Sequence, residues 1–159
     1  MKKKNIILFL LLFFVTFCVI DIFAIKCADI DIQELIVLLD GHSLLVYQKG
    51  KISFQDEHGI QPLLIQIKKK GLKNSVVVDK VIGKAAALLM AYGKVKQVHT
   101  NIIAKDAISV FEKYKIKYSY NEVVDYIQNI KKDGLCPMEQ KVLNIDNPKK
   151  AYKIFTKQK

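Results

Sequence analysis

From residue 28 onward, apolar residues follow two patterns that alternate along the chain. One has the 3.6-residue period of a helix with a single buried face, and the other is the short β-branched or alternating run of a strand. Helices are predicted over residues 32–39, 60–67, 80–92, 104–114 and 148–155. Strands are predicted over residues 43–48, 51–55, 76–78, 95–103 and 116–120. Shorter helices are expected from Glu122 and at the run CPMEQKVL, residues 136–143.

The first two predicted strands are separated by Lys49-Gly50 alone, which is typical of a tight hairpin. A hairpin makes its strands antiparallel, whereas strands joined through helices favour parallel pairing. The sequence therefore predicts a three-layer α/β/α domain with a mixed sheet over residues 28–159.

The stretch SVVVDKVIGKAAALLMAYG, residues 75–93, carries the most informative chemistry. Asp79 is expected to be the N-cap of a helix from Lys80 to Tyr92, with Gly83 and Lys84 on the same face as Lys80. Unpaired N–H groups and lysines at a helix start favour an anion. We therefore expect Asp79, Lys80, Gly83 and Lys84 to bind a small anionic ligand that is nucleotide-like or phosphorylated. The alternative is that the small residues pack on the sheet and the lysines face water.

The first 27 residues form a separate segment. Lys2–Lys4 precede an apolar block, Ile6–Ile25, that is interrupted only by Asp21. No small-residue cleavage site follows it, because Lys26 occupies the position where one would be needed. Residues 1–27 are thus expected to be a single-pass membrane anchor, with secretion after signal cleavage as the alternative.

The chain has a formal net charge of +11, and all its basic residues are lysines. Such an excess could attract nucleic acid, but the lysines are scattered apart from Lys68–Lys70. Arginine, which reads base edges in a bidentate manner, is absent from the sequence. A solvated lysine-rich surface is the preferred interpretation, and nucleic acid is not the favoured partner.

Three blocks of sequence carry a family resemblance: GIQPLL (Gly59–Leu64), VVVDKVIGKAAALL (Val76–Leu89) and GLCPMEQKVL (Gly134–Leu143). Together with the order helix, hairpin, helix, strand, helix, strand, helix, they resemble a small prokaryotic family of unknown function with a cytidine-deaminase-like fold. The resemblance covers residues 29–157. It implies a deaminase-type scaffold on which no reaction is established.

The zinc motifs of true deaminases are missing from the matching positions. Those enzymes have His-x-Glu or Cys-x-Glu at the first helix start and Pro-Cys-x-x-Cys at the second. Here the two starts read Gly83–Ala86 and Ala104–Ala107, without a ligand or a general acid. A catalytic zinc needs three protein ligands, and no pair of histidines has metal-ligand spacing. We therefore expect no metal, no cofactor and no zinc-dependent deamination.

Cys136 and Glu139 are the candidate catalytic residues. Cys136 precedes Pro137 at a predicted helix start, where a thiolate is favoured, and Glu139 is placed to cap the same turn. The alternative is a small buried cysteine and a capping glutamate. Beside a binding module, two functions stay open: an enzyme that uses Cys136 on an anionic substrate, and a basic surface for nucleic acid.

Overall fold

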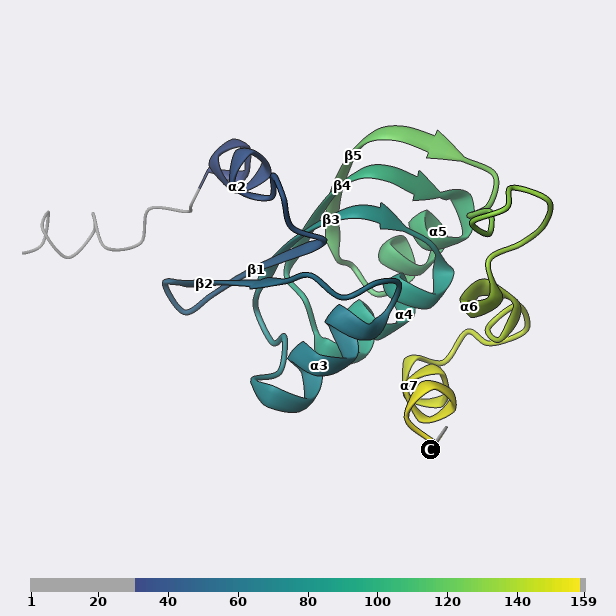
Figure 1. The fold of residues 1–159 in the computed structure, drawn as a ribbon. Coiled ribbons are helices and arrows are strands. Elements are labelled where there is room, and N and C mark those ends of the chain that lie inside the picture. Colours follow the sequence, from purple (N-terminus) through teal and green to yellow (C-terminus); the bar gives the residue numbers. More distant parts are fainter. Residues whose placement is uncertain (1–30, 158–159) are drawn as a thin grey trace, which may run out of the picture. The chain divides into compact units, whose positions relative to one another are not determined.

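Five strands form one mixed sheet (Figure 1). The structure is a computed structural model, and it describes residues 31–157. The strands are β1 (Leu44–Gln48), β2 (Lys51–Gln55), β3 (Val76–Ile82), β4 (Gln97–Ala104) and β5 (Lys117–Val124). They lie in the order β2-β1-β3-β4-β5, with β1 antiparallel to β2 and β3, and with β3, β4 and β5 parallel. The predicted α/β class with a mixed sheet is confirmed.

Six helices accompany the sheet among the described residues. They are α2 (Ile32–Leu38), α3 (Gln61–Lys69), α4 (Lys84–Gly93), α5 (Lys105–Lys113), α6 (Pro137–Gln140) and α7 (Pro148–Thr156). Their order along the chain, with the β1–β2 hairpin between α2 and α3, is the deaminase-like layout that the resemblance implies.

One face of the sheet carries the main core. Val46, Val77 and Val98 are paired across β1, β3 and β4 and are fully buried. Helix α4 covers them with the buried run Ala85–Met90 and packs against α3, α5 and α7. Small side chains at the start of this run allow the close packing that protein interiors require. Ala85, Ala86 and Ala87 are buried against the sheet, as the packing alternative for the small residues predicted.

The opposite face of the sheet carries a smaller apolar layer. Leu45 and Val78 point to this face because successive residues of a strand alternate between faces, and both are buried. Leu35 of α2 and Leu39 directly after it are also buried, and Figure 1 draws α2 apart from α3 and α4. We infer that α2 supplies the third layer.

The β1–β2 hairpin has the predicted two-residue turn. Lys49 and Gly50 both have positive φ, 52° and 73°. Two successive positive φ values define the turn type whose twist matches that of hairpin strands. Lys49 therefore lies in the turn itself, and Lys51 is the first residue of β2 after it.

Strand β3 is longer than predicted, and α4 begins later. The strand continues through Asp79 and Lys80 to Ile82, and α4 begins at Lys84 with Gly83 as its N-cap. The prediction that Asp79 caps a helix containing Lys80 is therefore wrong. Asp79 is paired with β1 on one side and with β4 on the other, and this pairing outweighs its local preference for a cap.

Strand β5 also extends beyond its predicted end. Residues 121–124 belong to the strand, and the short helix expected from Glu122 does not form. Because β5 is an edge strand and mostly exposed, its sequence lacks the alternation of buried and exposed residues that marks a half-buried strand.

The prediction of a membrane protein with a transmembrane helix is contradicted. Within residues 31–157, no helix combines the length and the apolar composition needed to cross a membrane. A crossing takes about 20 consecutive apolar residues. The expected anchor or signal segment, residues 1–27, lies outside the described residues.

Helix α7 has a side-chain N-cap that can be tested directly. The Asn147 side chain accepts hydrogen bonds from the N–H groups of Lys149 and Lys150, at 2.9 and 3.1 Å. Replacing Asn147 by Ala is expected to lower the free energy of unfolding by about 1 kcal/mol. The measurement is urea denaturation, with Asn144→Ala, an exposed asparagine nearby, as the control. An equal loss in both variants would contradict the capping role.

Candidate functional site

The start of α4 binds a carboxylate that comes from a distant part of the chain. Gly83, the N-cap, has no side chain to accept the first helical N–H groups. Glu139 of α6 accepts them instead: Oε2 from the Lys84 N–H at 2.7 Å and Oε1 from the Ala85 N–H at 3.0 Å. The unpaired N–H groups and the dipole of a helix start favour such an anion. The anion site expected here holds an internal ligand.

A side chain at position 83 would have to displace this carboxylate. A Cβ atom on Gly83 would lie 2.5 Å from both Cδ and Oε1 of Glu139, and 2.7 Å from Oε2. Such distances are well inside van der Waals contact. Because Gly83 has an extended backbone with φ −102°, glycine is required here for space and not for its conformational freedom.

The Glu139 side chain is 9% exposed, and burial raises the pKa of its carboxyl above the ordinary value. The N–H groups of Ala85 and Lys84 oppose this shift, because they stabilise the charged form. The Asp106 carboxylate raises the pKa further, whereas the Lys84 ammonium lowers it. Desolvation is the largest of these effects.

The Lys84 side chain connects the start of α4 to the segment between α6 and α7 through a hydrogen bond and an ion pair. Its Nζ donates to the Leu143 carbonyl at 2.8 Å and lies 3.2 Å from Asp146 Oδ1. The side chain is only 12% exposed. A small cavity of about 260 Å³ lies beside it, between Lys84, Asp106, Lys113 and Asp146. Charges of both signs line this cavity, so it has no net preference for an anion.

The other predicted ligand residues lie on β3. Lys80 is exposed. Asp79 accepts a hydrogen bond from the Val81 N–H at 3.2 Å. Burial raises the pKa of its carboxyl to about 7, against the opposing effect of the Val81 and Lys80 N–H groups. The structure thus brings Gly83, Lys84 and Glu139 together at the helix start, whereas Asp79 and Lys80 precede it on the strand.

Cys136 is half-buried, carries a free thiol and forms the N-cap of the four-residue helix α6, with Pro137 in the first turn as expected. Glu139 belongs to the same helix, but its carboxylate caps α4 and not its own turn. Within residues 31–157, no group of three His, Cys, Asp or Glu side chains is placed to hold a metal ion.

Two of the three histidines have clear structural roles. His42 contacts Asp56 at 2.7 Å and stacks on Phe54. His99 is 5% exposed, its Nδ1 lies 2.9 Å from Ser119 Oγ, and burial lowers its pKa. These contacts agree with the packed or solvated state expected for the histidines.

The fold and the site define a class of protein: an α/β domain with a mixed five-stranded sheet, in which helix α4 begins on a carboxylate of the chain itself. The chain belongs to the DUF1893 family, because residues 34–158 match the family model described as "TM1506: Domain of unknown function (DUF1893)". The resemblance to a family of unknown function is therefore confirmed. A search of curated protein sequences gave no match.

Two solved structures are similar to this chain. The DUF1893 family protein TM1506 from Thermotoga maritima is 27% identical and covers 80% of this chain and 89% of its own, with a TM-score of 0.75. The dCMP deaminase from cyanophage S-TIM5, in apo form, is 15% identical and covers 51% of this chain and 78% of its own, with a TM-score of 0.40.

Proposed function

We propose that this domain binds a small anionic ligand and does not perform zinc-dependent deamination. The Glu139 carboxylate at the start of α4 is the observation that argues against zinc-dependent deamination. This helix start matches the position at which true deaminases carry their first zinc ligand and their catalytic glutamate.

Three features support the absence of a zinc centre. The space next to Gly83, where a ligand side chain would begin, is filled by Glu139. The start of α5, at Lys105, has no cysteine in its first turn. Among residues 31–157, Glu139 does not belong to any group of three His, Cys, Asp or Glu side chains that could hold a metal ion, and a catalytic zinc needs three protein ligands.

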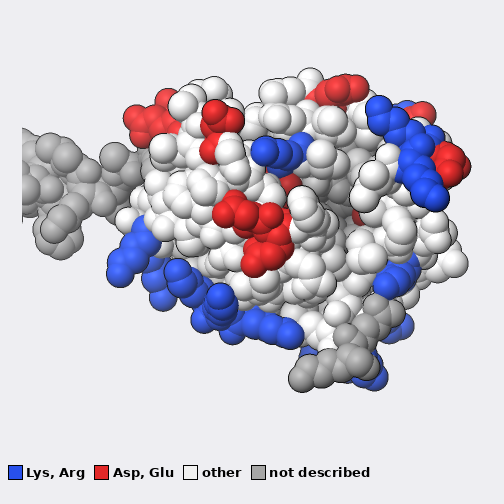
Figure 2. Space-filling model, in the orientation of Figure 1, with Lys and Arg blue, Asp and Glu red and all other residues white. Residues whose placement is uncertain are grey.

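The distribution of charge supports an anionic ligand. Figure 2 shows lysines gathered along the lower edge of the face in view, on the side where the β1–β2 hairpin and α3 lie in Figure 1. The formal net charge of +11 leaves many lysines without a carboxylate of their own. An anion from solution can reach the N–H groups of α4 only by displacing Glu139. The uncompensated lysines are therefore the better place for an external ligand.

Thermal denaturation tests the proposal with inorganic phosphate, pyrophosphate and citrate, and with ribose as the neutral control. At about 100 times its dissociation constant, a ligand stabilises the folded state by about 2.7 kcal/mol. For a domain of this size we expect Tm to rise by about 10 °C with at least one anion. Sodium chloride keeps the ionic strength constant.

Two results would contradict the proposal. One is that none of the anions raises Tm beyond the sodium chloride control. The other is that the purified protein holds about one zinc per chain and releases ammonia from cytidine or deoxycytidylate. Binding only to long nucleic acid, with a steep loss of affinity at higher salt, would favour the basic-surface alternative instead.

A further inference from the structure

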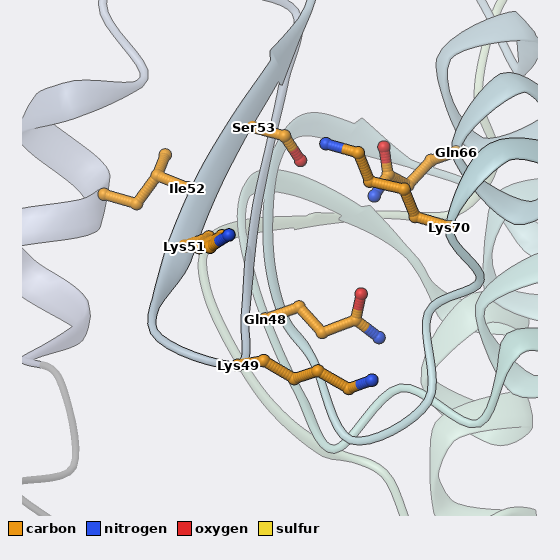
Figure 3. Close-up of a pocket in the computed structure, with 7 residues that line it drawn as sticks. All are labelled: Gln48, Lys49, Lys51, Ile52, Ser53, Gln66 and Lys70. Carbon is orange, nitrogen blue, oxygen red and sulfur yellow. The ribbon is translucent and has the colours of Figure 1, made fainter.

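We propose that the space between the β1–β2 hairpin and helix α3 is the binding site for the phosphate group of a phosphorylated small molecule. This inference rests on the proposed function, because it names the site and the ligand class of the same anion-binding activity. The cavity has a volume of about 420 Å³ and lies between hairpin residues and the end of α3 (Figure 3). That volume is in the range of small-molecule sites.

Six of the seven residues that line this cavity, which we call the hairpin pocket, have polar or cationic side chains. They are Gln48, Lys49, Lys51, Ser53, Gln66 and Lys70. No carboxylate lines it. An ammonium group is a compact point charge that suits phosphate, and a multiply charged anion can satisfy several such groups at once.

The three lysines of the hairpin pocket have no ion-pair partner among residues 31–157. Lys84 and Lys105, by contrast, contact Asp146 and Asp125. Lysines at the end of α3 would stabilise its C-terminal dipole without any ligand. That effect accounts for Lys70 but not for Lys49 and Lys51, which come from the hairpin. The convergence of cations from two elements points to a ligand.

Gln66 supplies the second, independent observation. Its residue is 1% exposed, and its side chain extends from α3 toward the hairpin pocket (Figure 3). No described residue forms a hydrogen bond with its side-chain amide. Because Gln66 lines the cavity, its amide can form a hydrogen bond with a polar group that enters from there. A phosphate oxygen is an acceptor for the amide N–H₂.

The walls of the pocket are held in place before any ligand binds. The Gln48 amide donates from Nε2 to the Lys73 carbonyl at 2.9 Å, which ties the end of β1 to the loop before β3. The two-residue turn at Lys49 and Gly50 fixes the tip of the hairpin. Preorganised walls lower the entropic cost of binding.

A second cavity provides room for the rest of the ligand. It has a volume of about 640 Å³, shares Gln48, Lys49 and Lys70 with the hairpin pocket, and continues to Lys73 and Tyr92. The phosphate of a phosphate ester would lie among the lysines of the hairpin pocket, and its organic part would extend into the second cavity. The pocket lies beside the first residues of β3, so it is about 20 Å from the start of α4, at the other end of that strand.

Isothermal titration of the full chain with inorganic pyrophosphate tests the site. Lys70→Met and Lys51→Met each remove one charge and are expected to weaken binding at least about tenfold. Gln66→Leu is expected to weaken binding, because the amide that lines the cavity is gone, while Tm without ligand changes little. A merely structural glutamine would lower Tm and leave affinity unchanged.

Lys117→Met, an exposed lysine of β5, is the matched control and should change affinity less than about twofold. Unchanged affinity in Lys70→Met and Gln66→Leu, with binding by the parent, would overturn the site and leave the proposed function standing. A selective loss in Lys80→Met would move the ligand to the end of β3 and also overturn the site. An equal loss in all lysine variants would indicate unspecific attraction and overturn it as well. If no anion stabilises the parent, the proposed function itself fails.

Discussion

Replacing Asp79 by Asn is expected to make the domain more stable at neutral pH. The Asp79 carboxyl has a pKa of about 7 in the folded protein, raised from 3.8 by burial. Between about pH 4 and pH 7, the Asp79 carboxyl is therefore protonated in the folded state and ionised in the unfolded state. The free energy of unfolding falls as the pH rises from about 4 to about 7, and the loss is complete above that value.

The size of the effect follows from the same shift. At about pH 8, Asp79→Asn should exceed the parent in stability by up to about 4 kcal/mol, whereas near pH 4 the two should be equal. Asparagine keeps the oxygen that accepts the Val81 N–H. The measurement is urea denaturation at a series of pH values. The effect of His99, whose pKa burial lowers, is common to both proteins and cancels in their difference.

Asp40→Asn is the control, because Asp40 is exposed and the substitution removes the same charge. Its difference from the parent should be small and independent of pH. A loss of stability in Asp79→Asn at about pH 8 would contradict the raised pKa of the partly buried Asp79 carboxyl.

Replacing Glu139 by Ala is expected to have an effect of similar size in the opposite direction. Its carboxylate accepts the first two N–H groups of α4, a helix in which Ala85–Met90 are buried. Burial disfavours the charge itself, so the loss comes chiefly from two donors left without an acceptor. Such donors cost about 1–3 kcal/mol each, and we expect a total near 3 kcal/mol and a fall in Tm of about 10 °C.

Glu57→Ala removes an exposed carboxylate and is the matched control. It should change the free energy of unfolding by less than about 0.5 kcal/mol. Equal stability of the two variants would mean that α4 does not depend on Glu139.

Local patterns in the sequence predicted the elements that local interactions form. The turn at Lys49-Gly50, the helix with Pro62 in its first turn and the helix after Asn147 all occur where residue type and spacing place them. The longer β3 was missed because a carboxylate in a central strand is unfavourable on its own. Only the pairing with β1 and β4 places Asp79 there.

The functional contacts were harder to predict, because they join distant parts of the chain. Glu139 meets Ala85 across 54 positions, and no sequence period reports such a pairing. One local signal was present: α4 follows a glycine and has no Ser, Thr, Asp or Asn N-cap. The hairpin pocket likewise combines lysines from the hairpin and from α3, which lie apart in the sequence.

A double-mutant cycle of Gly83→Ala and Glu139→Ala tests most directly whether the start of α4 is occupied by the chain's own carboxylate. The Cβ that Gly83→Ala adds would expel the carboxylate, so this substitution alone should cost about 2–3 kcal/mol. In the Glu139→Ala background the space is empty, and the same substitution should cost less than about 1 kcal/mol. The account predicts a coupling energy of about 2 kcal/mol, whereas additive costs within about 0.5 kcal/mol would contradict it.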